Sequence, residues 1–150
     1  MGASVYLDVQ NKEGGNIPII DMRKSAETFI AVHNAIKTNS LLSVHDISEG
    51  GVATALFEMA LGGRKGVTVN IPKRVRADHF LFNETAGCFV VEVEDKHMVS
   101  KVFKKIPYLY LGTTTKDDRM KVSQDNKTLF DVSIKSLRSS WEAPMRKIFA

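Results

Sequence analysis

A single cysteine, Cys88, stands in the sequence of 150 residues, so no disulfide can form within the chain. Its position beside the apolar run Phe89-Val90-Val91 predicts a buried small hydrophobic side chain rather than a nucleophile. A chain without a disulfide fits a reduced, cytoplasmic setting. No apolar run approaches the ~20 residues that cross a bilayer, and the N-terminus lacks the basic-then-apolar order of a signal peptide. The sequence therefore predicts neither a membrane protein nor an exported one.

Catalytic motifs are also scarce in this sequence. It has no nucleophilic triad, no zinc-ligand spacing, no P-loop and no GxGxxG. It has no repeat with a period of about 20 to 50 residues and no low-complexity tract, which excludes a solenoid. From the sequence we therefore assign no catalytic residue and no metal ligand.

The net charge of +4 arises from 21 basic and 17 acidic residues. Such a balance is compatible with a polyanionic partner, but the basic residues are scattered along the chain. The tightest group, Lys73, Arg74 and Arg76, has no interleaved aromatic residues of the kind that line a single-strand nucleic-acid groove. We expect these residues to form a solvated surface, and we expect no nucleic-acid partner.

Residues 41–63, LLSVHDISEGGVATALFEMALGG, are the stretch around which the rest of the chain is organised. A short apolar run leads into HDIS and two adjacent glycines, and apolar residues then recur at helical spacing. This pattern predicts a strand, a glycine turn and a helix. Glycines let another backbone or a phosphate come close, and the first amides of a helix suit an anion. The alternative is a tight strand-to-helix connection that has Ser48 as its N-cap and binds no ligand.

The polar residues of this turn, and those before the later apolar strand, are the candidates for ligand binding or for closing turns. His45 and Asp46 are adjacent on the expected strand, so their side chains should point to opposite faces and should not form a simple acid-base pair. The full candidate set is His45, Asp46, Ser48, Glu49, Gly50, Gly51, Asn83 and Glu84. Asp, Ser and Asn side chains often close turns, which is the structural alternative for these positions.

The first half of the chain predicts two further elements before the glycine turn. Alternation in residues 1–8 favours a short edge strand, and residues 11–16 read as a polar loop. Asp21 is placed to cap a helix that Asn39 would close, and Gly62 and Gly63 should end the helix after the glycine turn. The apolar stripe expected on the Asp21 helix comprises Met22, Ala26, Phe29, Ile30, His33 and Ile36.

The second half of the chain mixes strands and helices. Residues 67–71 form a strand ended by Pro72, residues 72–80 hold at most one helical turn, and residues 87–93 are typical of a central strand. Asp95 should cap a helix that ends at Pro107. We expect an antiparallel meander of three short strands at residues 108–111, 120–123 and 129–132. A last helix should follow, with apolar positions at Ile134, Leu137, Trp141 and Met145, and Pro144 should bend or end it. This order predicts an α+β fold with helices covering a mixed sheet.

Three segments of the sequence resemble one enzyme family. The segments are HDISEGG with the helix ending FEMALGG, LFNETAGCFVVEV at residues 81–93, and the tail at residues 129–149 with its WEAPM. They are similar to the C-terminal, AIR synthase-related domain of phosphoribosylformylglycinamidine synthase. That enzyme is also called formylglycinamide ribonucleotide amidotransferase, and the tail is similar to that of its small type. The resemblance runs from about Ile17 to the end. It implies an N-terminal strand and linker at residues 1–16, joined to an upstream domain, and one domain at residues 17–150.

The resemblance implies a fold, a reaction and partners. The fold would be a three-layer α/β/α domain like the AIR synthase C-terminal domain. The complete ligase would convert formylglycinamide ribonucleotide to the amidine in purine biosynthesis, with ATP, magnesium and ammonia from glutamine. Its catalytic histidine and most magnesium and substrate ligands lie upstream, so this chain should be inactive alone. The implied partners are the N-terminal domains of the same enzyme, a separate glutaminase subunit and a small accessory subunit. A stand-alone nucleotide- or phosphate-binding module and a purely structural domain remain alternatives.

Overall fold

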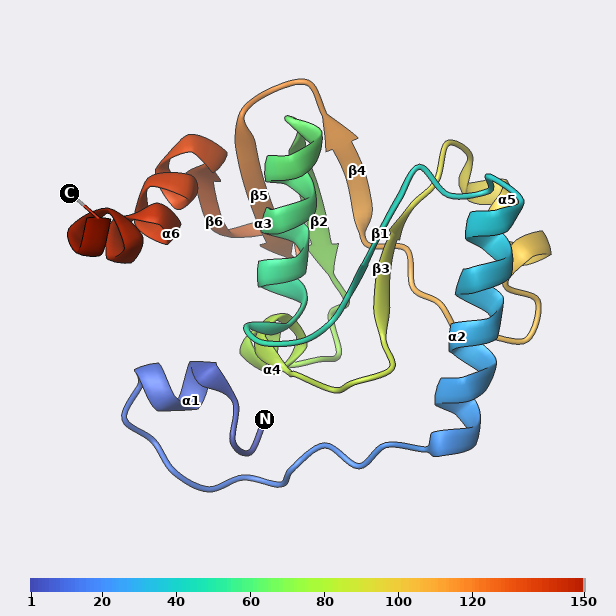
Figure 1. Ribbon diagram of the computed structural model, residues 1–150, viewed down its shortest axis with the longest axis horizontal. Helices are drawn as coiled ribbons and strands as arrows, with labels where there is room; N and C mark the ends of the chain where they lie inside the picture. The colour runs from blue at the N-terminus through green and yellow to red at the C-terminus, as the bar shows by residue number, and fades with distance from the viewer. Residues whose placement is uncertain (150) are drawn as a thin grey trace. The chain divides into compact units, whose positions relative to one another are not determined.

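The computed structural model describes residues 1–149, which form two compact units (Figure 1). Unit 1 comprises Met1–Ala55 and Asp78–Tyr110, and unit 2 comprises Leu56–Ala77 and residues 111–149. Helix α3 (Gly51–Gly63) begins in unit 1 and continues into unit 2. Within the described residues, no helix is both long enough and apolar enough to cross a membrane.

Unit 1 is built from short helices around a two-stranded sheet. Strands β1 (Ser43–Asp46) and β3 (Phe89–Glu92) pair antiparallel, with Asp46 opposite Phe89. The helices of this unit are α1 (Val5–Val9), α2 (Met22–Lys37), α4 (Ala77–Phe82) and α5 (Lys96–Val102). Asp21 caps α2 by accepting the N–H groups of Arg23 and Lys24 at 3.1 Å, and Asp95 caps α5, so both predicted N-caps are confirmed.

One apolar cluster of unit 1 lies beneath α2. Val32 and Ala35 of α2 and Phe103 after α5 are buried, and partly buried residues of both strands and of α5 pack against them. The predicted stripe of α2 is therefore wrong, because Met22 is 77% exposed and Ile30 is 62% exposed, and Phe29 is only half-buried, with its ring against Phe89. The small side chains at positions 31, 32 and 35 let the helix approach the strands closely, and these three positions form its buried face.

Unit 2 contains a four-stranded mixed sheet with the order β4-β2-β5-β6. Strands β2 and β5 are parallel and the other two pairs are antiparallel. Val69, Ile71, Met120 and Val122 are 0 to 2% exposed and form its centre. The elements are β2 (Gly66–Ile71), β4 (Gly112–Thr115), β5 (Arg119–Gln124), β6 (Lys127–Ser133) and α6 (Ile134–Phe149). The predicted α+β class with a mixed sheet is confirmed.

Two predicted strands are wrong. Residues 1–8 contain helix α1 instead, because the Ser4 side chain accepts the N–H of Leu7 and starts a helical turn. Residues 108–111 are not a strand. Only the Leu111 carbonyl reaches β2, where it accepts the N–H of Asn70 at 2.9 Å, and pairing with β2 begins at Gly112. A Cβ at Gly112 would collide with the Thr68 carbonyl oxygen, so the close approach of β4 to β2 depends on this glycine.

The predicted strand arrangement also needs correction. Strand β3 is not central, since it pairs with β1 alone within residues 1–149. The predicted meander holds only for β5 and β6, because β4 pairs with β2. The hairpin between β5 and β6 turns at Asp125 and Asn126, which both have positive φ, as the polar turn predicted.

Three local predictions need correction. Helix α3 ends at Gly63, as predicted, but no glycine closes it in the left-handed conformation. Arg64 takes φ +51° instead, and the Lys65 N–H donates to the Ala60 carbonyl at 3.0 Å. Helix α6 continues through Pro144 to Phe149, so Pro144 does not end it, while the predicted bend stays a prediction. Cys88 is exposed rather than buried, because it precedes β3 at the edge of unit 1.

Candidate functional site

The glycine turn lies between β1 and α3, as the sequence predicted. Gly50 and Gly51 have φ of +76° and +66°, which disfavours residues with a side chain. A Cβ at Gly51 would lie 2.6 Å from the Leu81 carbonyl oxygen and 2.8 Å from the Phe82 Cα. The end of α4 therefore packs directly on the start of α3, and it leaves no room for a larger residue at position 51.

A carboxylate from outside the turn closes it. Glu84 Oε1 accepts the N–H of Gly50 at 2.9 Å and the N–H of Val5 at 3.0 Å. One oxygen thus ties the glycine turn to the start of α1. In the ligand-free alternative from the sequence, the Ser48 side chain would cap the helix. The side-chain acceptor is Glu84 instead, and the Ser48 carbonyl accepts the N–H of Gly51 at 3.0 Å. The anion at this helix start is a carboxylate of the protein itself.

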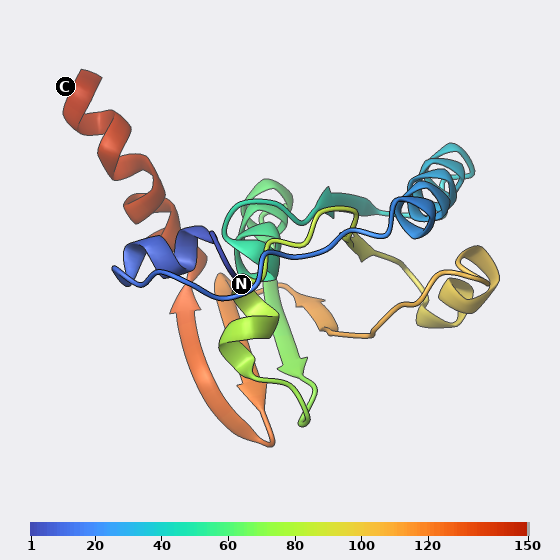
Figure 2. The ribbon, with the colours of Figure 1, turned by 90° about the horizontal axis from the view of Figure 1, so that it is seen from below.

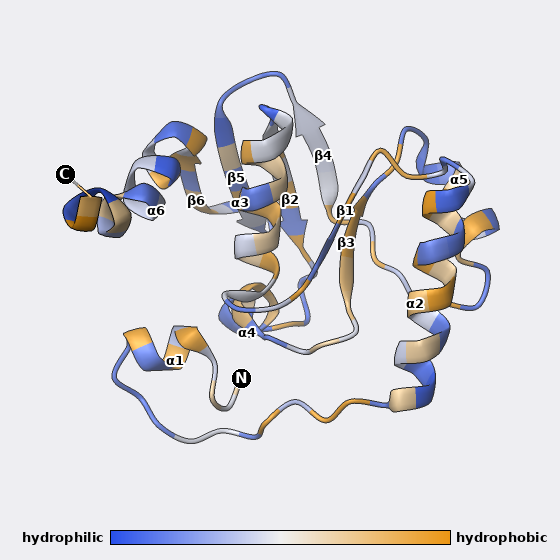
Figure 3. Ribbon diagram, in the orientation of Figure 1, coloured by the Kyte–Doolittle hydropathy of each residue, from blue (hydrophilic) through white to orange (hydrophobic). Residues whose placement is uncertain are grey.

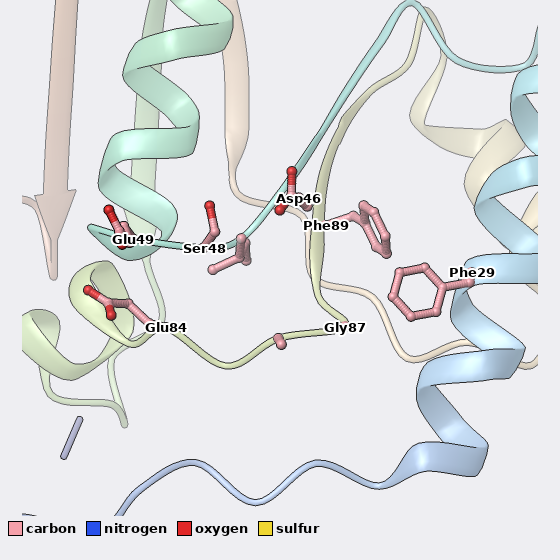
Figure 4. Close-up of a pocket in the computed structure, with 9 residues that line it drawn as sticks. Phe29, Asp46, Ser48, Glu49, Glu84, Gly87 and Phe89 are labelled. Carbon is pink, nitrogen blue, oxygen red and sulfur yellow. The ribbon is translucent and has the colours of Figure 1, made fainter. Parts of the chain in front are cut away.

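A pocket of about 390 Å³ lies beside the turn (Figure 4). Four of the predicted candidates meet there: Asp46, Ser48, Glu49 and Glu84. The rings of Phe29 and Phe89 lie on the other side, edge to face with centroids 5.4 Å apart. The remaining lining residues are Ile47, Ala86 and Gly87. Sequence reasoning missed both phenylalanines, because Phe29 had been placed on a buried stripe and Phe89 inside a central strand.

The other candidates lie outside the pocket lining. His45 Nδ1 is 2.7 Å from the Asp46 carbonyl oxygen and 3.7 Å from Asp46 Oδ1. The prediction that these two side chains cannot pair is therefore wrong, because β1 ends at Asp46 and strict alternation ends with it. Asn83 donates to Thr85 Oγ1 at 2.5 Å and closes the segment after α4. Gly50 and Gly51 supply the backbone conformation of the turn.

The electrostatics of the pocket do not suit a phosphate. Asp46, Glu49 and Glu84 bring three carboxylates to it, no basic residue lines it, and the N–H of Gly50 is already bonded to Glu84. The residues present therefore do not fit the polyphosphate of a nucleotide. Among residues 1–149, no cluster of three or more His, Cys, Asp or Glu residues is arranged to hold a metal ion.

The lowered pKa values lie away from this turn. The backbone N–H of Lys24 lowers the pKa of the Asp21 carboxyl group. Hydrogen bonds from Arg138 and Arg146 lower the pKa of Glu142 on α6.

Residues 2–125 match the family model described as AIR synthase related protein, C-terminal domain. The chain belongs to this family. A curated relative from Deinococcus radiodurans, phosphoribosylformylglycinamidine synthase subunit PurL, is 32% identical over 99% of this chain. The subunit of the same name from Zymomonas mobilis is 34% identical over 95% of this chain. This chain spans only 21% and 19% of the length of these relatives.

Solved structures confirm the fold. Thermotoga maritima PurL complexed with FGAR matches 81% of this chain with a TM-score of 0.67 and 15% identity, over 22% of its own length. The PurLQS structure from Thermotoga maritima matches 80% of this chain with a TM-score of 0.68 and 14% identity, over 22% of that chain. The resemblance identified from HDISEGG, LFNETAGCFVVEV and the tail is thus confirmed, together with the fold class.

Proposed function

We propose that this chain is the C-terminal domain of a phosphoribosylformylglycinamidine synthase. That ligase converts formylglycinamide ribonucleotide to formylglycinamidine ribonucleotide with ATP, magnesium and ammonia, in the cytoplasm. The observation that carries the proposal is the alignment of two curated PurL subunits with 95 to 99% of this chain, at 32 to 34% identity. Another structural neighbour is Thermotoga maritima PurL complexed with ATP, which supports nucleotide use by the longer enzyme.

Within that enzyme, the glycine turn would act as a structural joint rather than as the catalytic phosphate site. The bonds from Glu84 to the N–H groups of Gly50 and Val5 support this role, and so does the acidic pocket lining. Gly51 would allow the close contact between α4 and α3, and Asn83 would fix the segment after α4 through its bond to Thr85. The exposed side chains of Asp46 and Glu49 would be available to other domains. The ATP-dependent chemistry would then be carried by domains outside this chain, and the chain alone would form no product.

The partners of the enzyme are part of the proposal. The N-terminal domains of the same enzyme would account for the other four-fifths of the length of the curated relatives. A separate glutaminase subunit would supply ammonia, with help from a small accessory subunit. Two observations support this arrangement: the curated relatives are named as subunits, and one structural neighbour is PurLQS from Thermotoga maritima.

The test is a direct assay of the whole protein that the gene encodes. We expect the whole protein to release ADP only when formylglycinamide ribonucleotide, ammonia and magnesium-ATP are all present. The 150-residue chain should give no turnover under the same conditions. A folded whole protein without substrate-dependent ADP release would contradict the proposed reaction. Turnover by the 150-residue chain, retained after further purification, would contradict the proposed role of this domain.

A further inference from the structure

Residues 1–10 form a short segment, the N-terminal strap, that has little structure of its own. Its helix, α1, has five residues, and none of them is buried. A helix of this length is not stable in isolation. Residues 8–17 are all exposed, and residues 12–21 form neither helix nor strand; Figure 2 shows this extended connection running from α1 to α2. The strap therefore keeps its place through its contacts with the rest of unit 1.

The strap is seated on the end of α4. The ring of Tyr6 stacks on that of Phe82, with centroids 4.5 Å apart and an angle of 8° between the planes. Ser4, which caps α1, is 3% exposed. The N–H of Gly2 donates to the Asn16 carbonyl at 2.9 Å and closes the strap into a loop. Figure 3 shows hydrophobic residues in α1 and hydrophilic ones directly after it, so the apolar packing of the strap ends with this helix.

The residues that seat the strap also contact the glycine turn. The ring of Phe82 carries the strap, and its Cα is an atom that a Cβ at Gly51 would meet at 2.8 Å. Glu84 Oε1 accepts the N–H of Val5 at 3.0 Å and the N–H of Gly50 at 2.9 Å. Phe82 and Glu84 therefore each meet the strap on one side and the turn on the other.

The backbone that carries Glu84 is held from its other side. Gly87 has φ +80°, and a Cβ there would lie 2.6 Å from Ser25 Oγ of α2. The N–H of Ile47 donates to the Cys88 carbonyl at 2.9 Å. Because the backbone is fixed on that side, a change in the strap acts on the side chain of Glu84. A glutamate side chain has several rotamers, and its hydrogen bonds to the strap and the turn select one of them.

We propose that the N-terminal strap is a conformational device that sets the state of the glycine turn. While the strap is seated on Phe82, the Val5 N–H fixes the carboxylate of Glu84 against the N–H of Gly50. When the strap leaves its seat, Glu84 loses one of its two donors, and the Gly50 N–H opens to the pocket more often. The coupling is reciprocal, so a ligand that displaces Glu84 from Gly50 would also loosen the strap. The use of the strap by an upstream domain, which would pull on it through residue 1, rests on the proposed function, whereas the coupling within unit 1 does not.

The first test is a matched pair of variants at Val5. This residue is the first of α1, where proline is well tolerated, and Ser4 before it is extended, with φ −83° and ψ 150°. Val5→Pro therefore removes the N–H that Glu84 accepts and keeps the helix, whereas Val5→Ala keeps both. We expect hydrogen exchange at the Gly50 amide to be about fivefold faster in Val5→Pro than in Val5→Ala, which is the factor that one hydrogen bond gives.

The reference amide is that of Val122, which is 0% exposed in the sheet of unit 2 and should exchange at the same rate in both variants. Equal rates at Gly50 in the two variants would overturn the proposal. So would a Val122 amide accelerated as much as that of Gly50, because the substitution would then destabilise the whole chain rather than release the turn.

A second pair of variants removes the seat of the strap without changing Glu84 or its donors. Tyr6→Ala deletes the ring that stacks on Phe82, and Tyr108→Ala makes the same change at a residue that is 57% exposed. Tyr6→Ala should accelerate exchange at both Val5 and Gly50, and Tyr108→Ala at neither. An unchanged Gly50 amide in Tyr6→Ala overturns the proposal, whether or not Val5 responds. This pair also decides the matter if Val5→Pro does not fold.

The whole protein that the gene encodes tests whether the device operates there. Hydrogen exchange of the peptide covering residues 48–54, followed by mass spectrometry, should be faster in Val5→Pro than in Val5→Ala. Equal exchange of this peptide in the two whole proteins would overturn the strap as a device of the enzyme. Absence of substrate-dependent ADP release in the unsubstituted protein would instead reject the proposed function, and the exchange comparison would still decide on the strap.

Discussion

Units 1 and 2 differ in how they are held together. Unit 2 buries Val69, Ile71, Met120 and Val122 almost completely inside a four-stranded sheet. Unit 1 has a two-stranded sheet, its buried apolar residues are divided between the α2 cluster and the region of α3 and α4, and polar bonds such as those of Glu84 close its turns. Two-stranded sheets are marginal by themselves, so unit 1 depends on packing by its helices and on local closure by polar bonds. Unit 1 also carries all of the predicted site residues.

The candidate site residues and the side chains with the lowest exposure therefore lie in different units. A site region that is held by a few hydrogen bonds can be rearranged by another domain at little cost, whereas a packed sheet cannot. The first three of the following substitutions each have a control that makes the same chemical change elsewhere, and the fourth is compared with the unsubstituted chain.

The largest effect is expected in the core of unit 2. Ile71→Ala should lower the free energy of unfolding by about 3 kcal/mol, because it leaves a cavity beside residues that cannot collapse into it. That loss corresponds to roughly 10 °C in Tm at this chain length. Ile19→Ala is the control, since Ile19 is 95% exposed, and it should leave the thermal unfolding curve unchanged. Equal shifts for the two variants would mean that the sheet of unit 2 is not the stable part.

A smaller loss is expected at the glycine turn. Gly51→Ala should lower the free energy of unfolding by about 2 kcal/mol, because φ is positive there and the new Cβ would press on the Leu81 carbonyl. Gly62→Ala makes the same change near the other end of α3, where a Cβ meets nothing within 4 Å. It should stabilise the helix by about 0.5 to 1 kcal/mol. Denaturant unfolding measures both variants, and shifts of the same sign would show that the turn is misplaced.

The carboxylate of Glu84 should contribute less to global stability. Glu84→Ala removes the acceptor for two N–H groups and should cost about 1.5 kcal/mol. Hydrogen exchange should accelerate most at Gly50 and Val5, which Glu84 binds at 2.9 and 3.0 Å. Glu49→Ala is the control, because its exposed side chain lines the same pocket. If Glu49→Ala accelerates exchange at Gly50 as strongly, Glu84 is not the closing group.

The smallest effect concerns pH and the start of α2. The pKa of Asp21 is lowered mainly by the backbone N–H of Lys24, so folding is stabilised at pH values above the ordinary range of an Asp carboxyl. That stabilisation should be lost as the pH falls through the lowered pKa. Asp21→Asn keeps an acceptor without the charge, so its Tm should fall less than that of the unsubstituted chain between pH 7 and pH 3. Parallel losses of Tm in the two proteins would contradict this assignment.

The sequence predicted those features that depend on neighbours in the chain. Asp21 and Asp95 cap their helices, and the run from β1 through Gly50 and Gly51 to α3 forms as its pattern indicated. It did not predict contacts between distant residues. Glu84 lies 34 residues from Gly50 and 79 residues from Val5, and no local pattern marks an acceptor at that separation.

The outward face of α2 was unpredictable for a related reason. Periodicity shows that Phe29 and Ile30 share a side of the helix, but not which side the strands will cover. Val32 and Ala35 are the buried positions of α2 because the helix packs closely against β1 and β3 there. The pairing of β4 with β2 likewise depended on a glycine, Gly112, and not on apolar content.

The central claim is that Glu84 already accepts the N–H of Gly50 and that carboxylates line the adjacent pocket, so that this chain offers no strong phosphate site at the glycine turn. The most direct test is a titration of the ¹⁵N-labelled chain with magnesium-ADP while backbone amide NMR signals are followed. We predict that the signals of Gly50, Gly51 and Val52 do not move at sub-millimolar concentrations. Saturable sub-millimolar shifts centred on Ser48 to Val52 would contradict the account.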